Sequence, residues 1–302
     1  MIHTVGLVLH PKRDSAPAIE AIIKWAAARQ ITVLGLPDEV GRIDCSAVSV
    51  SAEELVERAT LMVSLGGDGT MLRSMRMIAS AKAGAGPTQG GRTTPVLGVN
   101  LGRLGFLAEI DVDELPSALT AIDGHQFTVE PRMAVRTTLP SGEEVTAFND
   151  IALVRIPGDG QAAVGISVQG NPFVRYAADA LIVATTTGST AYSFSAGGPI
   201  VSPTVEGILV VPAAAHSSFS RALVLAASEE LSLDLLPSSG RLAVEVDGGV
   251  SGYLAPCDTL AVTAQPAAAQ VVRLGYTTFY ERARRKLRVN GSAEVDWEAT
   301  PS

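Results

Sequence analysis

Residues 61 to 70 read Leu-Met-Val-Ser-Leu-Gly-Gly-Asp-Gly-Thr, an apolar run that ends directly in a glycine-rich turn. The run from Leu61 to Leu65 is typical of a buried strand. Beyond Thr70, apolar residues recur at helical spacing as far as Ala79, which predicts a helix. The stretch therefore predicts a strand, a tight turn and a helix in direct succession.

Strands and helices alternate on both sides of this turn. Apolar and β-branched runs predict strands at residues 4–10, 31–36 and 95–99, and periodic or capped segments predict helices at residues 19–26, 51–59 and 113–122. Such alternation is typical of a parallel sheet with helices on its faces, whose ligand crevice lies at the carboxyl ends of the strands. We therefore expect an α/β domain with a Rossmann-like parallel sheet over residues 1–124, with the glycine turn at its crevice.

The pattern changes after residue 124 to short β-rich runs separated by turn signals. These runs predict strands at residues 133–139, 145–156, 164–169, 180–184, 231–235, 242–246 and 259–262. An alanine-rich piece at residues 266–269 predicts a turn. We expect a β-rich domain of the β-sandwich type over residues 125–275, and we expect the C-terminal tail, residues 276–302, to pack back on the α/β domain.

The turn from Gly66 to Thr70 is suited to binding phosphate. Its glycines let the backbone approach a ligand with no Cβ in the way, so that backbone amides can surround phosphate oxygens. Asp68 is the one group in the turn that can accept a proton or hold a metal ion. The alternative is a plain strand-to-helix turn with Asp68 as its N-cap, and the turn alone leaves both interpretations open.

Two more clusters follow predicted strands. The segment from Asn100 to Leu107 leaves the strand beside the glycine turn, which would place Asn100 and Phe106 at the same crevice, although Phe106 could equally belong to the core. The segment from Thr185 to Tyr192 has six hydroxyl groups in eight residues, which suits ribose and phosphate oxygens. The alternative for this second segment is a polar surface turn.

Lysines are scarce, and this limits the kind of phosphate chemistry. The four lysines, Lys12, Lys24, Lys82 and Lys286, all lie outside the glycine and threonine clusters, and no P-loop motif occurs in the sequence. We therefore exclude a P-loop mechanism. If phosphate is transferred, its charge must be managed by backbone amides, arginines and a divalent cation, for which Mg²⁺ is our expectation.

Composition narrows the class of protein further. The 302 residues are 47% hydrophobic with a net charge of −8, which predicts a globular protein with no basic stripe for nucleic acid. Cys45 and Cys257 are far apart in sequence, so neither a disulfide framework nor a paired-cysteine zinc site is indicated. We see no signal peptide and no apolar run long enough to span a membrane, and we expect a cytoplasmic protein.

Together, in their order and spacing, the three clusters resemble the NAD kinase family over nearly the whole chain. Gly66 to Thr70 is similar to the family's first motif, Asn100 to Leu107 to its second, and Thr187 to Pro199 to its third. The resemblance implies an enzyme that phosphorylates the 2′-hydroxyl of the adenosine ribose of NAD to give NADP, with ATP or polyphosphate as the donor. It also implies a homodimer or homotetramer.

The resemblance implies a role for each matching residue. Asp68 would be the base that activates the ribose 2′-hydroxyl. The residues that would contact NAD are Gly69, Phe106, Asn149, Asp150, Asp179, Thr187, Thr190, Ala191, Tyr192, Ser195 and Asp247. We assign the phosphates of the donor to Gly66, Gly67, Thr70, Arg73 and Asn100.

Three positions depart from the family pattern. Asp150 stands where the family has glutamate, Ala180 where it prefers glycine, and Thr186 where it usually has proline. They motivate one alternative, a catalytically weak NAD(P)-binding regulator. A second alternative is a lipid or sugar kinase of the wider superfamily that shares the glycine turn, although such an enzyme has no need of the threonine-rich loop.

Overall fold

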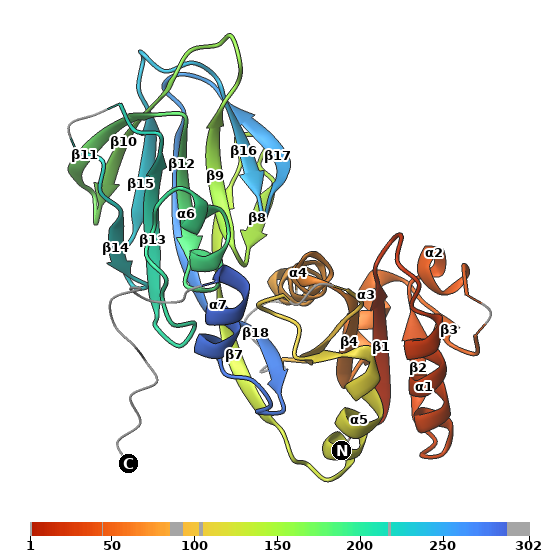
Figure 1. The fold of residues 1–302 in the computed structure, drawn as a ribbon. Coiled ribbons are helices and arrows are strands. Elements are labelled where there is room, and N and C mark those ends of the chain that lie inside the picture. The colour runs from red at the N-terminus through yellow and green to blue at the C-terminus, as the bar shows by residue number, and fades with distance from the viewer. Residues whose placement is uncertain (1, 44, 85–92, 103–104, 217–218, 289–302) are drawn as a thin grey trace, which may run out of the picture.

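The structure is a computed structural model that describes the chain except for residues 1, 44, 85–92, 103–104, 217–218 and 289–302 (Figure 1). It has an α/β region and a β-rich region, which Figure 1 shows side by side. The predicted fold class, a parallel α/β sheet followed by a β-sandwich, is confirmed. No helix in the described part of the chain is long and apolar enough to cross a membrane.

The α/β region is built on parallel strands in the order β3-β2-β1-β4-β5. Its elements are β1 (Thr4–Leu9), α1 (Ala16–Ala27), β2 (Thr32–Gly35), α2 (Pro37–Val40), β3 (Val48–Ser49), α3 (Ala52–Arg58), β4 (Leu61–Gly66), α4 (Asp68–Gly84), β5 (Pro95–Asn100), β6 (Ile110–Asp111), the short 3₁₀ helix η1 (Val112–Glu114) and α5 (Leu115–Asp123). Gly66 pairs with Asn100, so the ends of β4 and β5 meet at one edge.

Apolar side chains on both faces of this sheet explain the layered arrangement. On one face, the core of β1 and β4 packs against α1 and α5, and on the other it packs against α3 and α4. A strand buried on both faces reads as a continuous apolar run, which is why β1 and β4 were predicted from sequence. Helix α3 begins where its capping pattern predicts, because the Ser51 side chain accepts a hydrogen bond from the amide of Glu54.

The β-rich region encloses one large apolar core between two antiparallel layers. One layer has the strand order β14-β13-β12-β9-β16-β17, and the other contains β11, β10, β15, β18, β7 and β8. The elements are β7 (Thr128–Thr138), β8 (Glu144–Ala147), β9 (Asp150–Arg155), β10 (Ala162–Val168), β11 (Asn171–Ala178), β12 (Ala180–Thr185), η2 (Thr187–Thr190), α6 (Tyr192–Ser195), β13 (Gly207–Ala213), β14 (Leu223–Ala226), β15 (Leu231–Leu235), β16 (Leu242–Val246), β17 (Gly249–Leu254), β18 (Thr259–Arg273) and α7 (Phe279–Leu287).

Two details of the sequence prediction are wrong. The expected turn at residues 266–269 lies inside β18, where the pairing with β7 shifts register between Gln265 and Ala269 and Ala267 has a φ of 49°. A bulge lets the strand bend without ending there. The expected strand at residues 145–156 is divided into β8 and β9, which belong to different layers.

The long strands β7 and β18 join the two regions. At its far end β18 pairs in parallel with β5, so the sheet of the α/β region continues into the β-rich region. Helix α7 follows β18 and begins with a capping box between Thr278 and Glu281. The described part of the C-terminal tail therefore starts as a well-capped helix beside the α/β region (Figure 1).

A buried carboxylate fastens α7 and β18 to the α/β region. The side chain of Glu109, which has no exposed surface, accepts hydrogen bonds from Arg273 at 2.8 Å, from Arg282 at 3.0 Å and from the amide of Leu274 at 2.9 Å. Arg282 on α7 also donates to the carbonyl of Ala108. Since ionised groups inside a protein need partners, this cluster fixes where α7 lies.

We expect Glu109→Gln to lower the free energy of unfolding by about 3 to 5 kcal/mol, because it leaves the buried guanidinium of Arg282 without its counter-charge and leaves Arg273 with Glu130 alone. Urea unfolding at pH 7 measures the change. Glu144→Gln, which removes the partner of Arg136 in a more exposed pair, is the control and should cost less than about 1 kcal/mol. Equal effects in the two variants would contradict this account of the cluster.

Candidate active site

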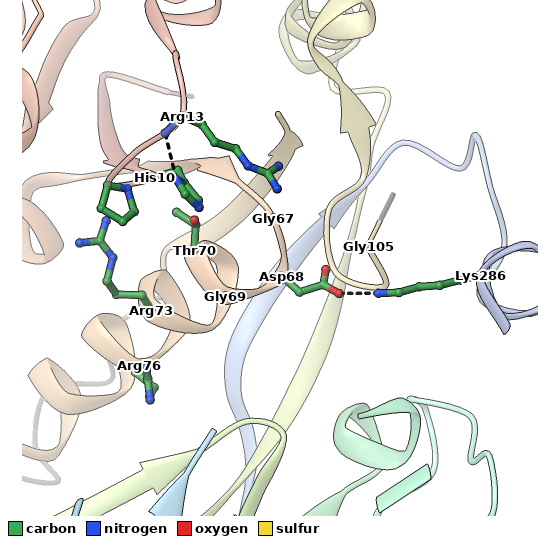
Figure 2. Close-up of a pocket in the computed structure, with 11 residues that line it drawn as sticks. His10, Arg13, Gly67, Asp68, Gly69, Thr70, Arg73, Arg76, Gly105 and Lys286 are labelled. Carbon is green, nitrogen blue, oxygen red and sulfur yellow. Dashed lines mark hydrogen bonds and ion pairs between the residues drawn. The ribbon is translucent and has the colours of Figure 1, made fainter. Parts of the chain in front are cut away.

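A cavity of about 590 Å³ lies at the carboxyl ends of the parallel strands, where the crevice was predicted (Figure 2). It combines the glycine turn with several cationic side chains. Its lining residues are His10, Pro11, Arg13, Gly67, Asp68, Gly69, Thr70, Arg73, Arg76, Gly105 and Lys286. A polar cavity of this size with an excess of positive charge suits a phosphate-bearing ligand.

The glycine turn has the shape that its sequence predicts. A Cβ on Gly66 would lie 2.1 Å from the Thr70 hydroxyl oxygen, so this position requires glycine, whereas Gly67 and Gly69 have open space where a Cβ would stand. Helix α4 starts at Asp68, and the amides at the first turn of a helix carry a partial positive charge that attracts anions. The turn can therefore hold phosphate oxygens against its backbone.

Asp68 is held by the neighbouring loop and not by its own helix. Its Oδ2 accepts the amide of Phe106 at 2.9 Å and its Oδ1 accepts the amide of Leu107 at 3.0 Å. The amides of Thr70 and Met71, which an N-cap side chain would receive, donate to the carbonyl of Gly67 instead. Asp68 therefore does not act as the N-cap, and its carboxylate faces the cavity (Figure 2).

The loop that holds Asp68 needs its own glycine. A Cβ on Gly105 would lie 2.0 Å from Asp68 Oδ1, so a larger residue would displace the carboxylate. Asn100 closes the start of this loop by donating to the carbonyl of Gly102 and to Asp111, and it does not line the cavity. The side chain of Asn100 is therefore engaged within the loop, and its contact with the donor stays a prediction; Arg103 and Leu104 lie outside the described residues.

The cationic side chains of the cavity differ in how far they are already bonded to other groups of the protein. Arg73 pairs with buried Glu39 and donates to the carbonyl of Leu9 at 2.7 Å, so part of its guanidinium is already engaged. Arg13, Arg76 and His10 also line the cavity, and none of them was predicted from sequence. Their positions offered one signal only, since His10 and Arg13 directly follow β1 and therefore lie at the same sheet edge.

The surroundings of His10 disfavour a positive charge on its imidazole. Burial, followed by the positive charges of Arg13, Arg73, Lys12 and Arg42, lowers the pKa of its imidazole. Its Nδ1 accepts the amides of Lys12 and Arg13, both at 3.1 Å, which leaves the other nitrogen as the one that carries the proton. The histidine thus fixes the backbone that presents Arg13.

Asp247 holds in place the segment that contains Asn149 and Asp150, two residues that the family resemblance expects to contact NAD. It has a φ of 48° and its carboxylate accepts the amides of Phe148, Asn149 and Asp150 at 3.2, 2.7 and 3.3 Å. These bonds turn the chain between β8 and β9. Burial raises the pKa of Asp247, and the same amide hydrogen bonds act in the opposite direction.

Arg76 of α4 contacts both the cavity and Asp247, which holds the segment of Asn149 and Asp150. Its Nη1 lies 3.7 Å from Asp247 Oδ2, while the residue also lines the cavity. Asp150 is buried beside this pair. Burial, then the charges of Asp247 and Glu245, raises the pKa of Asp150 to about 7.

Half of the hydroxyl groups in the threonine-rich loop are used internally. Thr185 donates to the carbonyl of Phe148 and accepts the amide of Gly188, and the hydroxyl of Ser189 bonds the backbone of Val201 in both directions. A Cβ on Gly188 would lie 2.0 Å from the carbonyl oxygen of Asn149, so the loop packs directly on the acceptor segment. Tyr192 and Ser195 stay exposed and open to a ligand.

Two residues expected to contact NAD, Asp179 and Phe106, lie apart from this loop, and their contact with NAD stays a prediction. Asp179 lies at the start of β12, opposite the end that leads to Thr187, and its carboxylate pairs with Arg155 at 2.6 Å. Phe106 is 8% exposed and is covered by Phe279 and Lys286 of α7. Thr187, Thr190, Ala191, Asn149 and Asp150 are brought together in one segment of the structure.

The described residues contain no group of three or more His, Cys, Asp or Glu side chains that could hold a metal ion. Asp68 is the one carboxylate among the residues that line the cavity. A divalent cation would therefore find a single protein ligand there and needs phosphate oxygens to complete its coordination.

Comparison with known proteins gives a consistent result. Residues 5–127 match the ATP-NAD kinase N-terminal domain and residues 148–274 match the ATP-NAD kinase C-terminal domain. NAD kinase 1 of Streptomyces avermitilis is 37% identical, over 98% of this chain and 91% of that protein. NAD kinase 1 of Streptomyces coelicolor is 36% identical, over 100% of this chain and 90% of that protein.

Solved structures show the same fold. The yeast NADH kinase complexed with NADH superposes with a TM-score of 0.81 at 25% identity, over 98% of this chain and 90% of that one. An NAD kinase from Archaeoglobus fulgidus in complex with ATP has a TM-score of 0.71 at 23% identity, over 95% and 100% of the two chains. Because both domains match in order and the relatives cover almost the whole chain, the resemblance is confirmed, and the chain belongs to the NAD kinase family.

Proposed function

We propose that the phosphorylation of NAD by this chain takes place in the cavity beside Asp68, where the terminal phosphoryl group of ATP or polyphosphate passes to the 2′-hydroxyl of the adenosine ribose. The observation that carries the proposal is the position of the Asp68 carboxylate. It lies at the mouth of the glycine turn, in a cavity with cationic side chains, and two backbone amides hold it in place.

Asp68 would serve as the general base. A ribose hydroxyl is a weak nucleophile at neutral pH, so a carboxylate within hydrogen-bond reach lowers the barrier by accepting its proton. The glycine turn, with Gly66, Gly67, Gly69 and Thr70, would hold the donor phosphates while Arg13, Arg73 and Arg76 offset their charge. In this arrangement the phosphate donor would lie on one side of Asp68 and NAD, the phosphate acceptor, on the other.

NAD would bind between the cavity and the threonine-rich loop. Asn149 and Asp150 are proposed to hold the adenosine ribose, and Arg76 ties their segment to the cavity through Asp247. Thr187, Thr190, Ala191, Tyr192 and Ser195 would contact the rest of the dinucleotide. Phe106 would pack near the adenine, next to Phe279 and Lys286 of α7, which already contact its ring.

Mg²⁺ is proposed to arrive with the donor. The scarcity of carboxylates in the cavity supports a cation that the phosphates carry, with Asp68 as a single protein ligand at most. We further propose that the chain works in the cytoplasm as a homodimer or homotetramer. Exposed apolar side chains on the β-rich region, among them Phe173, Val224 and Tyr253, support such an assembly.

The central expectation is NADP formation. Purified protein incubated with NAD, Mg²⁺ and either ATP or polyphosphate should produce NADP, detected with an NADP-specific dehydrogenase. No product with either donor would contradict the proposal and leave a binding regulator. Phosphorylation of a lipid or sugar in place of NAD would favour the wider kinase superfamily.

Asp68→Asn should lower kcat by about 10²- to 10⁴-fold, the contribution that general-base catalysis typically makes. The asparagine side chain keeps an oxygen for one of the two amides, Phe106 or Leu107, and loses the other hydrogen bond, so thermal unfolding is measured to check that the variant is folded. NAD binding, measured by calorimetry, should change little. A variant that retains near-normal turnover would show that Asp68 is not the base.

The raised pKa of Asp150 predicts a pH-dependent stability. The folded chain holds this proton up to about pH 7, whereas an unfolded aspartate releases it near about pH 3.9. The contribution of the protonated Asp150 to the stability of the folded chain is therefore complete at pH values below about 4 and is lost as the pH rises through about 7. The free energy of unfolding of Asp150→Asn, measured in urea and taken relative to that of the original chain, should therefore rise by on the order of 3 kcal/mol from about pH 5 to about pH 8.5.

Asp113→Asn, at an exposed carboxyl, is the matched control for this comparison. It should leave the pH dependence as it is in the original chain. If Asp150→Asn and the original chain show parallel stability profiles, Asp150 is ionised in the folded state at neutral pH, and the assignment of its environment is wrong.

A further inference from the structure

The last turn of α7 places a lysine at the proposed base. Lys286 Nζ lies 3.1 Å from Asp68 Oδ2 and 4.5 Å from the centre of the Phe106 ring, and the side chain lines the cavity (Figure 2). The sequence separation between Lys286 and Asp68 is 218 residues. Among the residues that line the cavity, Lys286 is the one lysine.

Helix α7 is built to hold Lys286 at this point. Its first turn is closed by the capping box of Thr278, and its middle is fixed by Arg282, which is buried against Glu109. Phe279 packs beside Phe106 with ring centres 6.4 Å apart. The lysine itself is 36% exposed, so its flexible stem can move while the helix stays in place.

The contact with Lys286 occupies the atom that the reaction needs. Asp68 Oδ2 already accepts the amide of Phe106, and the ammonium of Lys286 is its second donor. A ribose hydroxyl that gives its proton to Asp68 must bond a carboxylate oxygen, so it competes with the ammonium for this position. A donor phosphate in the cavity offers Lys286 more negative charge than a single carboxylate does.

We propose that Lys286 changes partner during the reaction, leaving Asp68 for the terminal phosphate of the donor and thereby freeing Asp68 to accept the ribose proton. This inference rests on the proposed function. In the transfer, the bond between the ribose 2′-oxygen and the terminal phosphorus forms, and the bond from that phosphorus to the bridging oxygen breaks. The hydroxyl proton passes to Asp68, and the leaving group, ADP or a polyphosphate shortened by one unit, keeps the electron pair.

Lys286 thereby has the task that a loop lysine has in P-loop enzymes, although it comes from the C-terminal helix. A lysine suits this exchange because its ammonium is a compact charge on a long flexible stem. Phe106 contributes a second contact, since the face of an aromatic ring attracts a cation and can hold the ammonium between its two partners.

Three variants test the exchange. Lys286→Met keeps the length of the stem against Phe106 but removes the charge, and Lys286→Arg keeps the charge. Arg285→Met removes the same charge from the neighbouring position of α7, where Arg285 pairs with Glu281 and does not line the cavity. Thermal unfolding checks that each variant is folded, and Lys286→Gln replaces Lys286→Met if the latter is not.

Lys286→Met should raise the KM for MgATP about 10- to 100-fold, the range that hydrogen bonds to charged groups supply. The KM for NAD should not rise, because the ammonium no longer competes for Asp68. Lys286→Arg should recover most of the loss, and Arg285→Met should match the original chain. Calorimetry with MgATP in the absence of NAD should rank the affinities of these variants for MgATP in the same order as their KM values.

Two results would overturn the inference. Lys286→Met with an unchanged KM and affinity for MgATP would show that Lys286 does not bind the donor, and equal losses for MgATP and NAD would show that it only shapes the site. The calorimetric titration requires no turnover. It therefore tests Lys286 even if the original chain forms no NADP, which would be the failure of the proposed function alone.

Discussion

The buried carboxylate of Glu109 is the contact on which the arrangement of the active site depends. It joins the segment after β5 to Arg273 at the end of β18 and to Arg282 in α7, which are both more than 160 residues away in sequence. The free energy of such a buried cluster is sensitive to every member, because each charge left alone carries a large desolvation cost. Through α7 the cluster positions Lys286, and through the loop that ends at Ala108 it positions the amides that hold Asp68.

Local signals explain which parts of the fold could be predicted from the sequence. The run from Leu61 to Thr70 contains its own strand, turn and helix start, and Ser51 caps the helix that follows it. The errors lie where a distant partner overrides the local pattern. Residues 145–156 read as one strand, but Asp247 draws in three consecutive amides there and sends the chain into the other layer. The alanine-rich piece at residues 266–269 reads as a turn, but pairing with β7 on both sides keeps it within β18.

The candidate site also has one part that could be predicted from local sequence and another part that depends on distant contacts. The glycine turn was predictable because its backbone geometry is a property of five consecutive residues, and Gly66 is required there by a contact with Thr70 four positions away. The placement of Arg76 against Asp247 and of Lys286 against Asp68 depends on how the two regions and α7 pack. The four lysines lie outside the sequence motifs, which excluded a P-loop lysine, but their place in the sequence does not reveal that the C-terminal helix brings Lys286 next to Asp68.

Helix α4 unites the two halves of the reaction. It begins at Asp68, beside the turn proposed to bind the donor phosphates, and two turns later Arg76 reaches Asp247, which shapes the segment proposed to hold the acceptor ribose. Between them, Arg73 ties the same helix to Glu39 and to the end of β1. A rigid helix with contacts to both sides fixes their separation, and correct separation of reacting groups is itself a large part of catalysis. The strand-to-helix turn at Asp68 thus sets the proposed donor position and, through the length of α4, the proposed acceptor position as well.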